Sequence, residues 1–377
     1  MPSYQQLFGV QVTTKRISQI AAASNLLLTE FGMQPGGPLE APGVGQRQLG
    51  WDVFNNVRAV PPGSVPGSQP VTVAPTPAGR VDVTVPRLNV SLPIDYEAFG
   101  NLRVLGGPSN TFDTLAADYI ERQRSRLGQQ VANWRALLLA GMIRGNLYAH
   151  VSGERIDYNF TSASSPFNID WQRPAGNKNQ LNMLGGGNIL DVPWSTPTAN
   201  IPLHLQQIDV AFQTLVGSRL EVIMTTNAVW QYIINNDYVQ AQAGTANTPF
   251  TVFARTDETM PNGERRTLTR ARLVCCPQYE FVLTDEGFEL SNGTYTPYLP
   301  ANTAWFGPRP RDRRFYEMLT GAEPISDAPN QQPVMRRGMY AFTYETFLPP
   351  RKHIVMYDNS VPAAYIPKAS AFGTLVF

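Results

Sequence analysis

The longest regular pattern of apolar side chains lies between residues 110 and 143. Its apolar positions recur at three- and four-residue steps, the spacing of one helix face: Phe112, Leu115, Tyr119, Ile120, Leu127, Val131, Trp134, Leu138 and Met142. Asn110 or Thr111 can cap the start, and no proline interrupts the segment. The pattern predicts a helix over 110–143, roughly 50 Å long at 1.5 Å per residue. Gly128 and Gly141 indicate a bend or the close approach of a neighbouring element.

A second pattern, the every-other-residue alternation of a β-strand, occurs within a proline-rich stretch over residues 51–104. Val81, Val83 and Val85 alternate with polar residues, and the stretch holds eight prolines. Because proline has no N–H to give to a ladder, these strands cannot lie in the middle of a sheet. We expect a long two-stranded hairpin that turns at 75–79 and lies on another surface, since a lone hairpin is marginal in water. A disordered proline-rich linker is the alternative.

Shorter patterns predict the remaining elements. A helix is expected over 15–31, ended by Gly32, in a segment with too few apolar residues for a core of its own, which indicates an arm. A polar, glycine-rich loop is expected over 161–193. The other predicted elements are a hairpin over 147–160 that turns at Ser152-Gly153, helices over 201–216 and 228–235, and strands over 88–92, 220–225, 267–274, 280–284, 339–348 and 353–356. The strand–helix alternation after residue 201 indicates a small mixed lobe.

The composition adds information about the surface. Of the 377 residues 16% are charged, below the usual quarter, and 30 basic residues nearly balance 29 acidic ones. A dedicated binder of nucleic acid or of a membrane surface usually carries a basic excess, so both classes are disfavoured. The longest apolar run, over 136–143, is too short to span a bilayer, and no segment fits a secretory signal. We expect a soluble cytoplasmic chain that hides much of its surface against partners.

Candidate chemistry is sparse in this sequence. His150, His204 and His353 do not lie at metal-ligand spacing, so each is expected to be a surface or hydrogen-bonded structural histidine. The sequence contains no nucleophile elbow of the GxSxG type and no phosphate-binding GxxxxGKS/T loop. Cys275 and Cys276 are adjacent in a strand-like run, where neighbouring side chains point to opposite faces, so a disulfide between them is not expected. The sequence therefore predicts no catalytic, metal-binding or cofactor-binding residues.

An arginine-rich loop is the most distinctive polar feature. Arg309, Arg311, Arg313 and Arg314 lie close together in the sequence, and the planar guanidinium group suits ion pairs across interfaces. An exposed, solvated loop is the alternative interpretation. The chain has only four lysines, Lys15, Lys178, Lys352 and Lys368, so arginine supplies most of its positive charge.

Taken in order, the predicted elements are an arm, a projecting proline-rich hairpin, a long helix, a hairpin, a mixed lobe and returning strands. This order resembles the major capsid proteins of tailed bacteriophages, which have the Hong Kong 97 type fold, and is most similar to the lambda-like capsid protein E family. The segments that carry the resemblance are Met142–Gly145 leading into Gly153–Phe160, Trp194-Ser195 before the helix and strand over 201–225, the turn in Tyr298–Phe306, and the closing segment Tyr344–Asp358. It covers residues 110–377 loosely, and before them only the architecture agrees.

The resemblance implies an α+β capsid fold of the Hong Kong 97 type, with an N-terminal arm, an extended β-hairpin loop, a long spine helix, and peripheral and axial domains. The expected boundaries are an arm over 1–50, the hairpin loop over 51–104, a peripheral domain over 105–200, an axial domain over 201–327 and returning strands over 328–377. The tail after Asp358 and the proline density of the hairpin depart from the family pattern.

The resemblance also implies a function. The chain would be a major capsid protein that self-assembles, through pentamers and hexamers, into the icosahedral shell around phage double-stranded DNA. The implied partners are further copies of the chain, scaffold and portal proteins, in some phages a decoration protein, and packaged DNA held by weak non-specific contacts. No membrane, cofactor or enzymatic activity is implied, and the protein would belong to the virion after assembly in the host cytoplasm. The alternatives are another virion protein such as a tail tube, which the long helix disfavours, and a cytoplasmic enzyme.

Two sets of residues are expected to act between subunits. They are Arg309, Arg311, Arg313 and Arg314 in the loop, and Val81, Val83 and Val85 in the hairpin. The type member of the fold joins its subunits covalently through a lysine of the projecting loop, but residues 51–104 contain no lysine. Arginine cannot replace it, because its guanidinium group stays protonated. We therefore expect a shell held together without covalent bonds.

Overall fold

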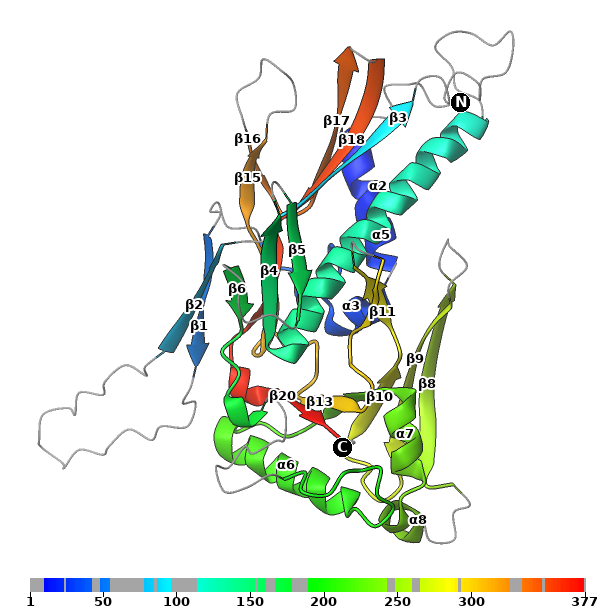
Figure 1. Cartoon of the computed structure of the whole chain (residues 1–377), viewed down its shortest axis with the longest axis vertical. Helices are drawn as coiled ribbons and strands as arrows, with labels where there is room; N and C mark the ends of the chain where they lie inside the picture. Colours follow the sequence, from blue (N-terminus) through cyan, green and yellow to red (C-terminus); the bar gives the residue numbers. More distant parts are fainter. Residues whose placement is uncertain are drawn as a thin grey trace, which may run out of the picture.

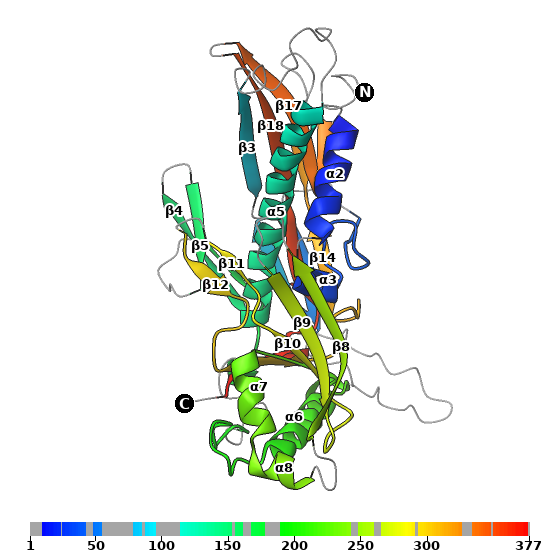
Figure 2. The same ribbon diagram turned by 90° about the vertical axis from the view of Figure 1, so that its right-hand side faces the viewer.

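The computed structural model describes residues 10–23, 25–42, 48–54, 78–84, 87–95, 114–152, 155–160, 167–177, 189–242, 248–259, 265–290, 293–325, 334–347 and 350–375. The molecule is elongated, with two lobes one above the other along its long axis (Figure 1). The upper lobe is built along the long helix α5, and the lower lobe around a six-stranded sheet beside three helices. A view turned by 90° shows α2 and α5 side by side in the upper lobe (Figure 2).

Helix α5 (Thr114–Arg144) confirms the helix predicted over 110–143 and forms the spine of the upper lobe. Its 31 residues correspond to a length of about 46 Å. Between Val131 and Ile143 nearly every side chain is buried, because other elements surround this half of the helix. Gly145, with φ at 94°, ends the helix, and its N–H donates to the Gly141 carbonyl at 2.7 Å. The capping residues expected at 110–111 lie outside the described residues.

The single N-terminal helix predicted over 15–31 is instead two helices, α2 (Val10–Ala23) and α3 (Leu26–Phe31). The prediction is wrong because Asn25 starts a new helix: its backbone is extended and its side chain accepts a hydrogen bond from Leu28 N at 2.8 Å. Helix α2 packs on α5 at Gly128, where a Cβ atom would come within 2.6 Å of Ile20 Cγ2. The close approach expected at this glycine is confirmed.

A three-stranded antiparallel sheet, in the order β17–β18–β3, packs against these helices in the upper lobe. Its strands are β17 (Tyr340–Phe347), β18 (Pro350–Asp358) and β3 (Leu88–Asp95). Pro93 lies on β3, an edge strand of this sheet, as the missing N–H of proline requires. One face of the sheet buries Ile94 and Ile354 in a cluster with Ile120 of α5. The opposite face carries aromatic side chains and is described below.

The projecting hairpin pairs β1 (Gln48–Phe54) with β2 (Ala78–Thr84), and residues 55–77 between them lie outside the described residues. The turn predicted at 75–79 is wrong for Ala78 and Gly79, which pair with Phe54 and Val53 inside the ribbon. Both residues follow Pro77 and keep an N–H for the ladder. The strand predicted over 88–92 does not extend this hairpin, because β3 pairs with β18.

Smaller ribbons complete the upper lobe. The hairpin predicted over 147–160 is confirmed, with Ser152 paired to Arg155 at its turn. The loop predicted over 161–193 is wrong at 167–170, which pairs with β4 as β6; Phe167 and Ile169 alternate there with polar residues. The elements are β4 (Asn146–Ser152), β5 (Arg155–Asn159), β6 (Phe167–Asp170), β11 (Gly287–Glu289), β12 (Tyr295–Pro297), β14 (Tyr316–Thr320), β15 (Ala322–Ile325), β16 (Val334–Arg337) and β19 (Ser360–Ala364). The 3-10 turns η1 (Ala175–Asn177) and η2 (Pro367–Ala369) contact β20 and α6 of the lower lobe, respectively.

The lower lobe contains a mixed sheet in the order β20–β13–β7–β10–β9–β8, in which only β7 and β10 run parallel. Its elements are β7 (Val222–Thr225), β8 (Phe250–Thr259), β9 (Arg265–Leu273), β10 (Glu280–Thr284), β13 (Thr303–Gly307), β20 (Ala371–Thr374), α6 (Ile201–Val216), α7 (Asn227–Ile234) and α8 (Asp237–Gln242). Asn200 caps α6 and Gly217 ends it, so both predicted bounds are confirmed. Strand β8 was not predicted, because most of its side chains on both faces are exposed and no alternation marks it.

Cys275 and Cys276 lie in the turn between β9 and β10, so the strand-like run predicted around them is wrong. The Cys276 N–H donates to the Leu273 carbonyl at 3.3 Å, and that turn ends β9. Both cysteines are free; Cys276 is buried and Cys275 is partly buried. The argument from opposite strand faces therefore does not apply to this pair.

Candidate inter-subunit surfaces

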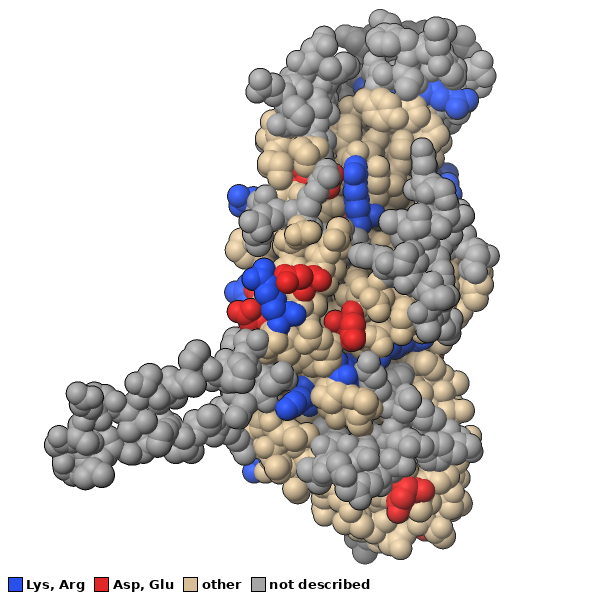
Figure 3. All heavy atoms as spheres, turned by 60° about the vertical axis from the view of Figure 1, so that its left-hand side comes forward, with Lys and Arg blue, Asp and Glu red and all other residues tan. Residues whose placement is uncertain are grey.

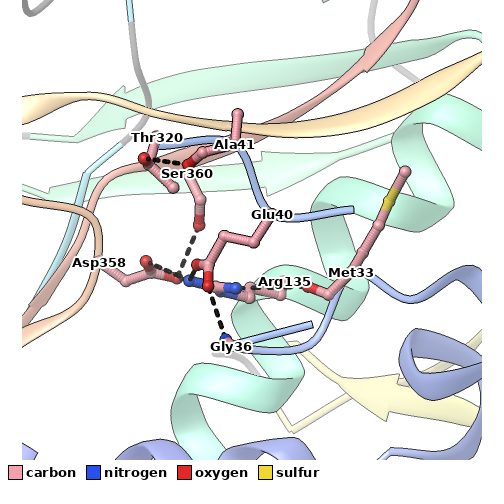
Figure 4. A network of polar contacts seen from close by, with 8 residues as sticks. All are labelled: Met33, Gly36, Glu40, Ala41, Arg135, Thr320, Asp358 and Ser360. Atoms are coloured by element: carbon pink, nitrogen blue, oxygen red, sulfur yellow. Dashed lines mark hydrogen bonds and ion pairs between the residues drawn. The ribbon is translucent and has the colours of Figure 1, made fainter. Parts of the chain in front are cut away.

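A buried ion network fixes the N-terminal segment to the centre of the upper lobe (Figure 4). Arg135 of α5 donates from Nε and Nη2 to the two carboxylate oxygens of Asp358, at 2.9 and 3.1 Å, and from Nη2 to Glu40 Oε1 at 2.8 Å. The side chains of Arg135 and Asp358 are fully buried. Burial alone would lower the pKa of Arg135, but the charges and hydrogen bonds of Asp358 and Glu40 outweigh it and raise that pKa. The network positions three segments of the upper lobe relative to one another.

The N-terminal segment also joins the two lobes at α3. Glu30 pairs with Arg270 of β9 in the lower lobe. Arg311 donates to the carbonyl oxygens of Thr29 and Glu30 at 3.0 and 3.1 Å, which are at the end of α3. Arg311 is one of the residues expected to act between subunits, but its guanidinium group instead binds the end of α3 within this chain.

The other arginines of the predicted interface loop pair locally. The pairs are Arg309 with Glu221, Arg313 with Glu317 and Arg314 with Asp312, at 2.9, 2.7 and 2.6 Å. The arginine side chains remain 73, 57 and 78% exposed, and exposed pairs of this kind contribute about 0–1 kcal/mol. These guanidinium groups are therefore accessible to a partner, and their role between subunits stays a prediction.

The valines predicted to act between subunits lie on the β1–β2 ribbon. Val81 and Val83 are each 5% exposed and belong to the apolar core of the upper lobe together with Trp51. Their side chains therefore contact this chain itself, because alternate residues of β2 face the core. Val85 lies outside the described residues. The exposed side of the ribbon carries Arg80 and Asp82, which pair at 2.7 Å.

The lower lobe exposes apolar side chains on its helices. Leu203 and Val210 are two turns apart on α6 and are 44 and 55% exposed, and Tyr232 of α7 and Tyr238 of α8 are 40 and 42% exposed. Helix α6 carries a single acidic residue, Asp209, and no lysine or arginine. Leu203 and Val210 share the exposed side of α6 with the uncharged polar residues Gln206, Gln207 and Thr214. A surface with exposed apolar side chains and so little charge suits contact with another protein.

Aromatic side chains gather on the outer face of the β17–β18 pair, away from α5. Tyr340, Phe342 and Tyr344 alternate along β17, and His353 and Tyr357 lie beside them on β18. The sequence predicts both strands, but this face was not among the expected features. The signal was present, because every second residue over 340–344 is aromatic.

The side chains of His204 and His353 make contacts within the chain. Trp194 Nε1 donates to His204 Nδ1 at 3.1 Å, and His204 Nε2 lies 3.4 Å from Asp191 Oδ1, so the ring proton belongs on Nε2. Burial lowers the pKa of His204, while the charge of Asp191 and its hydrogen bond act in the opposite direction. His353 stacks on Tyr344, with ring centroids 4.7 Å apart. The side chain of His150 lies outside the described part of the chain.

Charge is spread thinly over the surface. On the face shown in Figure 3, the described basic and acidic residues form small groups separated by uncharged surface. Within the described ranges, no group of three or more His, Cys, Asp or Glu side chains could hold a metal ion. None of the helices described is both long and apolar enough to cross a bilayer.

Comparison with known proteins identifies the fold. No family model matches the sequence, and no curated protein matches it. A solved structure assigned as the capsid protein of a prophage of Escherichia coli CFT073 superposes with a TM-score of 0.53 at 10% sequence identity, covering 97% of each chain. The chain has the Hong Kong 97 type capsid fold.

Two further solved structures are similar over nearly the whole length. A phage-related protein of Bordetella bronchiseptica RB50 gives a TM-score of 0.43 at 10% identity, with 97% of both chains covered. The virus-like particle of Pyrococcus furiosus gives 0.42 at 7% identity, with 96% of this chain and 98% of that one covered. The fold assignment rests on the prophage protein, and it confirms the α+β fold class inferred from the sequence. Membership of the lambda-like capsid protein E family stays a prediction.

Proposed function

We propose that the chain is a major capsid protein that self-assembles into the icosahedral shell enclosing phage double-stranded DNA. The observation that carries this proposal is the capsid fold, shared over 97% of each chain with the prophage protein. Its role is then structural and not catalytic. The protein works as a component of the virion, assembled in the host cytoplasm.

The surface supports association with further copies. The exposed Leu203 and Val210 of α6 offer apolar contacts, and the accessible guanidinium groups of Arg309, Arg313 and Arg314 offer charged ones. Obligate interfaces bury on the order of 2,000–5,000 Å², which suits a chain with only 16% charged residues. A net charge of +1 also suits a container that holds its DNA weakly.

The proposal assigns the lobes to shell positions. The upper lobe is the peripheral domain, and the lower lobe, formed by 201–284, 303–307 and 371–374, is the axial domain that meets its copies in pentamers and hexamers. Scaffold, portal and decoration proteins are the further partners. The β1–β2 ribbon contacts a neighbour through residues other than Val81 and Val83, because these two side chains are buried in the core of their own chain.

The experiment is a size measurement on the full chain, expressed with and without the proteins of neighbouring genes. We expect shells or capsomers by light scattering and negative-stain electron microscopy. Tubes instead of closed shells would favour a tail-tube protein. A chain that remains a small soluble oligomer under every condition would contradict the proposal and favour the enzyme alternative.

A further inference from the structure

A cleft opens on the upper lobe beside the spine helix α5. Strands β3 and β11 both contact α5, and Figure 2 shows β3, β5 and β11 on one side of that helix, with α2 on the other. Side chains of α5, β3, β5 and β11 line the cleft, which has a volume of about 320 Å³. Cavities that bind small molecules usually measure roughly 300–1,000 Å³. The cleft is therefore large enough for a small ligand.

Three polar groups of side chains that line this cleft are buried without a hydrogen-bond partner among the described residues. They are Gln130 Oε1, Trp134 Nε1 and the hydroxyl of Tyr158. Trp134 is only 8% exposed, and its ring meets that of Tyr158 edge to face, with centroids 5.2 Å apart. Nearly all buried polar groups in native proteins have a partner. A molecule bound in the cleft can supply the partners that these three groups lack.

The other side chains around the cleft favour a ligand with an apolar body and no negative charge. Leu88 and Val90 of β3, Leu137 of α5 and Phe288 of β11 provide apolar walls. Glu289, which is exposed, is the single charged residue among the described residues that line the cleft. Because no described lysine or arginine lines it, a carboxylate or phosphate would be buried there without a counter-charge. The cleft therefore suits an uncharged molecule.

The three unpartnered groups define the polar head of that molecule. The indole N–H of Trp134 can only donate, the side-chain oxygen of Gln130 can only accept, and a tyrosine hydroxyl can do both. Burial raises the pKa of Tyr158 to about 12, so its hydroxyl keeps the proton and can donate. Gln130 and Trp134 are one turn apart on α5 and lie on the same side of the helix. A carboxamide matches this set, because its carbonyl oxygen accepts two hydrogen bonds and its N–H donates one.

We propose that this cleft binds an uncharged small molecule with an apolar body and a carboxamide head group. The carbonyl oxygen of the ligand accepts from Trp134 Nε1 and the Tyr158 hydroxyl, and its N–H donates to Gln130 Oε1. Its body packs on Val90 and Phe288. A ligand in this position contacts α5, β3, β5 and β11 together, and it stabilises the upper lobe because it binds the folded chain alone. This site goes beyond the proposed shell function and does not depend on it.

The test compares two probes of nearly the same shape, naphthalene-2-carboxamide and naphthalene-2-carboxylate. Their binding to the unassembled full chain is measured by isothermal titration calorimetry. We expect a dissociation constant of about 0.1–1 mM for the carboxamide. The carboxylate should bind about tenfold more weakly or not at all, because its charge finds no partner in the cleft. Saturating carboxamide should also raise the urea unfolding midpoint. Equal affinity of the two probes, or no binding of the carboxamide, would overturn the proposal.

Two tyrosine variants separate ligand binding from folding. Tyr158→Phe removes one donor and keeps the ring, so it should weaken carboxamide binding about fivefold. It should leave the urea midpoint of the ligand-free chain unchanged, because the hydroxyl has no partner to lose among the described residues. The matched control is Tyr238→Phe, on α8 in the lower lobe, which should change neither quantity.

A third variant fills the cleft. Val90→Trp should abolish carboxamide binding, and binding as tight as in the parent would place the ligand elsewhere. Unchanged affinity of Tyr158→Phe would contradict the assigned head group. A lower midpoint of ligand-free Tyr158→Phe would show that the hydroxyl already has a partner, such as an ordered water, and would overturn the proposal as well. None of these results bears on the shell function, which the size measurement tests.

Discussion

Replacing Arg135 by methionine should destabilise the subunit by several kcal/mol. The guanidinium group makes a two-pronged pair with Asp358 and further hydrogen bonds to Glu40 Oε1 and the Met33 carbonyl, the last at 3.3 Å. In the Arg135→Met variant Asp358 remains fully buried, and among the described side chains the hydroxyl of Ser360, at 2.9 Å, is the donor that remains to compensate its charge. Removing one partner of a buried pair costs about 3–5 kcal/mol, because the other charge is left uncompensated.

The measurement is urea unfolding of the unassembled full chain, followed by circular dichroism. The matched control is Arg16→Met, because Arg16 pairs with Glu121 at the surface, where the two side chains are 49 and 35% exposed. That change should cost about 0–1 kcal/mol. A double variant, Arg135→Met with Asp358→Leu, should recover part of the loss, since both charges leave the core together.

The urea unfolding midpoints of these variants can refute this explanation. If Arg135→Met unfolds at the same urea concentration as Arg16→Met, the buried network contributes no more than a surface pair. If the double variant is less stable than Arg135→Met, the stabilisation comes from the shape of these side chains and not from their charges.

Four other predictions follow from the same structure. Deleting residues 67–77 from the projecting hairpin should leave the circular dichroism spectrum unchanged and abolish stable shells, and normal particles from this variant would contradict the prediction. The double variant Arg313→Glu with Arg314→Glu should lower particle yield more than subunit stability, because both groups are exposed. An equal fall in both quantities would show that the loop stabilises the subunit and does not act between subunits. The pKa of His204 is lowered on folding, so the unfolded chain binds more protons and stability should fall as the pH drops below about 6.5; His204→Gln should flatten this dependence of the urea midpoint. Boiled particles should run as one band near 41.7 kDa on a denaturing gel, since residues 51–104 contain no lysine, and a ladder of multiples would show covalent joining.

The sequence predicts the elements whose signal is local. Helix α5 follows from the repeat of apolar positions, and the bounds of α6 follow from Asn200 and Gly217. The position of Pro93 on an edge strand follows from its missing N–H. These features depend on a few neighbouring residues, so a single sequence is enough to predict them.

Features that depend on distant partners could not be predicted. Arg135 borders an apolar run in the sequence, and nothing near it reveals that Asp358 lies 223 positions later as its partner. Strand β8 has no alternation, because both of its faces are exposed. The valines of β2 were assigned to a neighbour because an isolated hairpin needs a surface, and the surface turned out to be this chain's own core.

The distance in sequence between contacting segments has a consequence for synthesis. Thr14 Oγ1 donates to the Ala341 carbonyl at 3.0 Å and accepts from the Ala341 N–H at 3.1 Å, so α2 is held by a strand that is translated 327 positions later. In the lower lobe, β13 pairs with β20, over Ala371–Thr374. Neither lobe can therefore be completed before these later strands have left the ribosome, and contacts of such long range form slowly. The early helices of the upper lobe thus remain without part of their packing while most of the chain is being made.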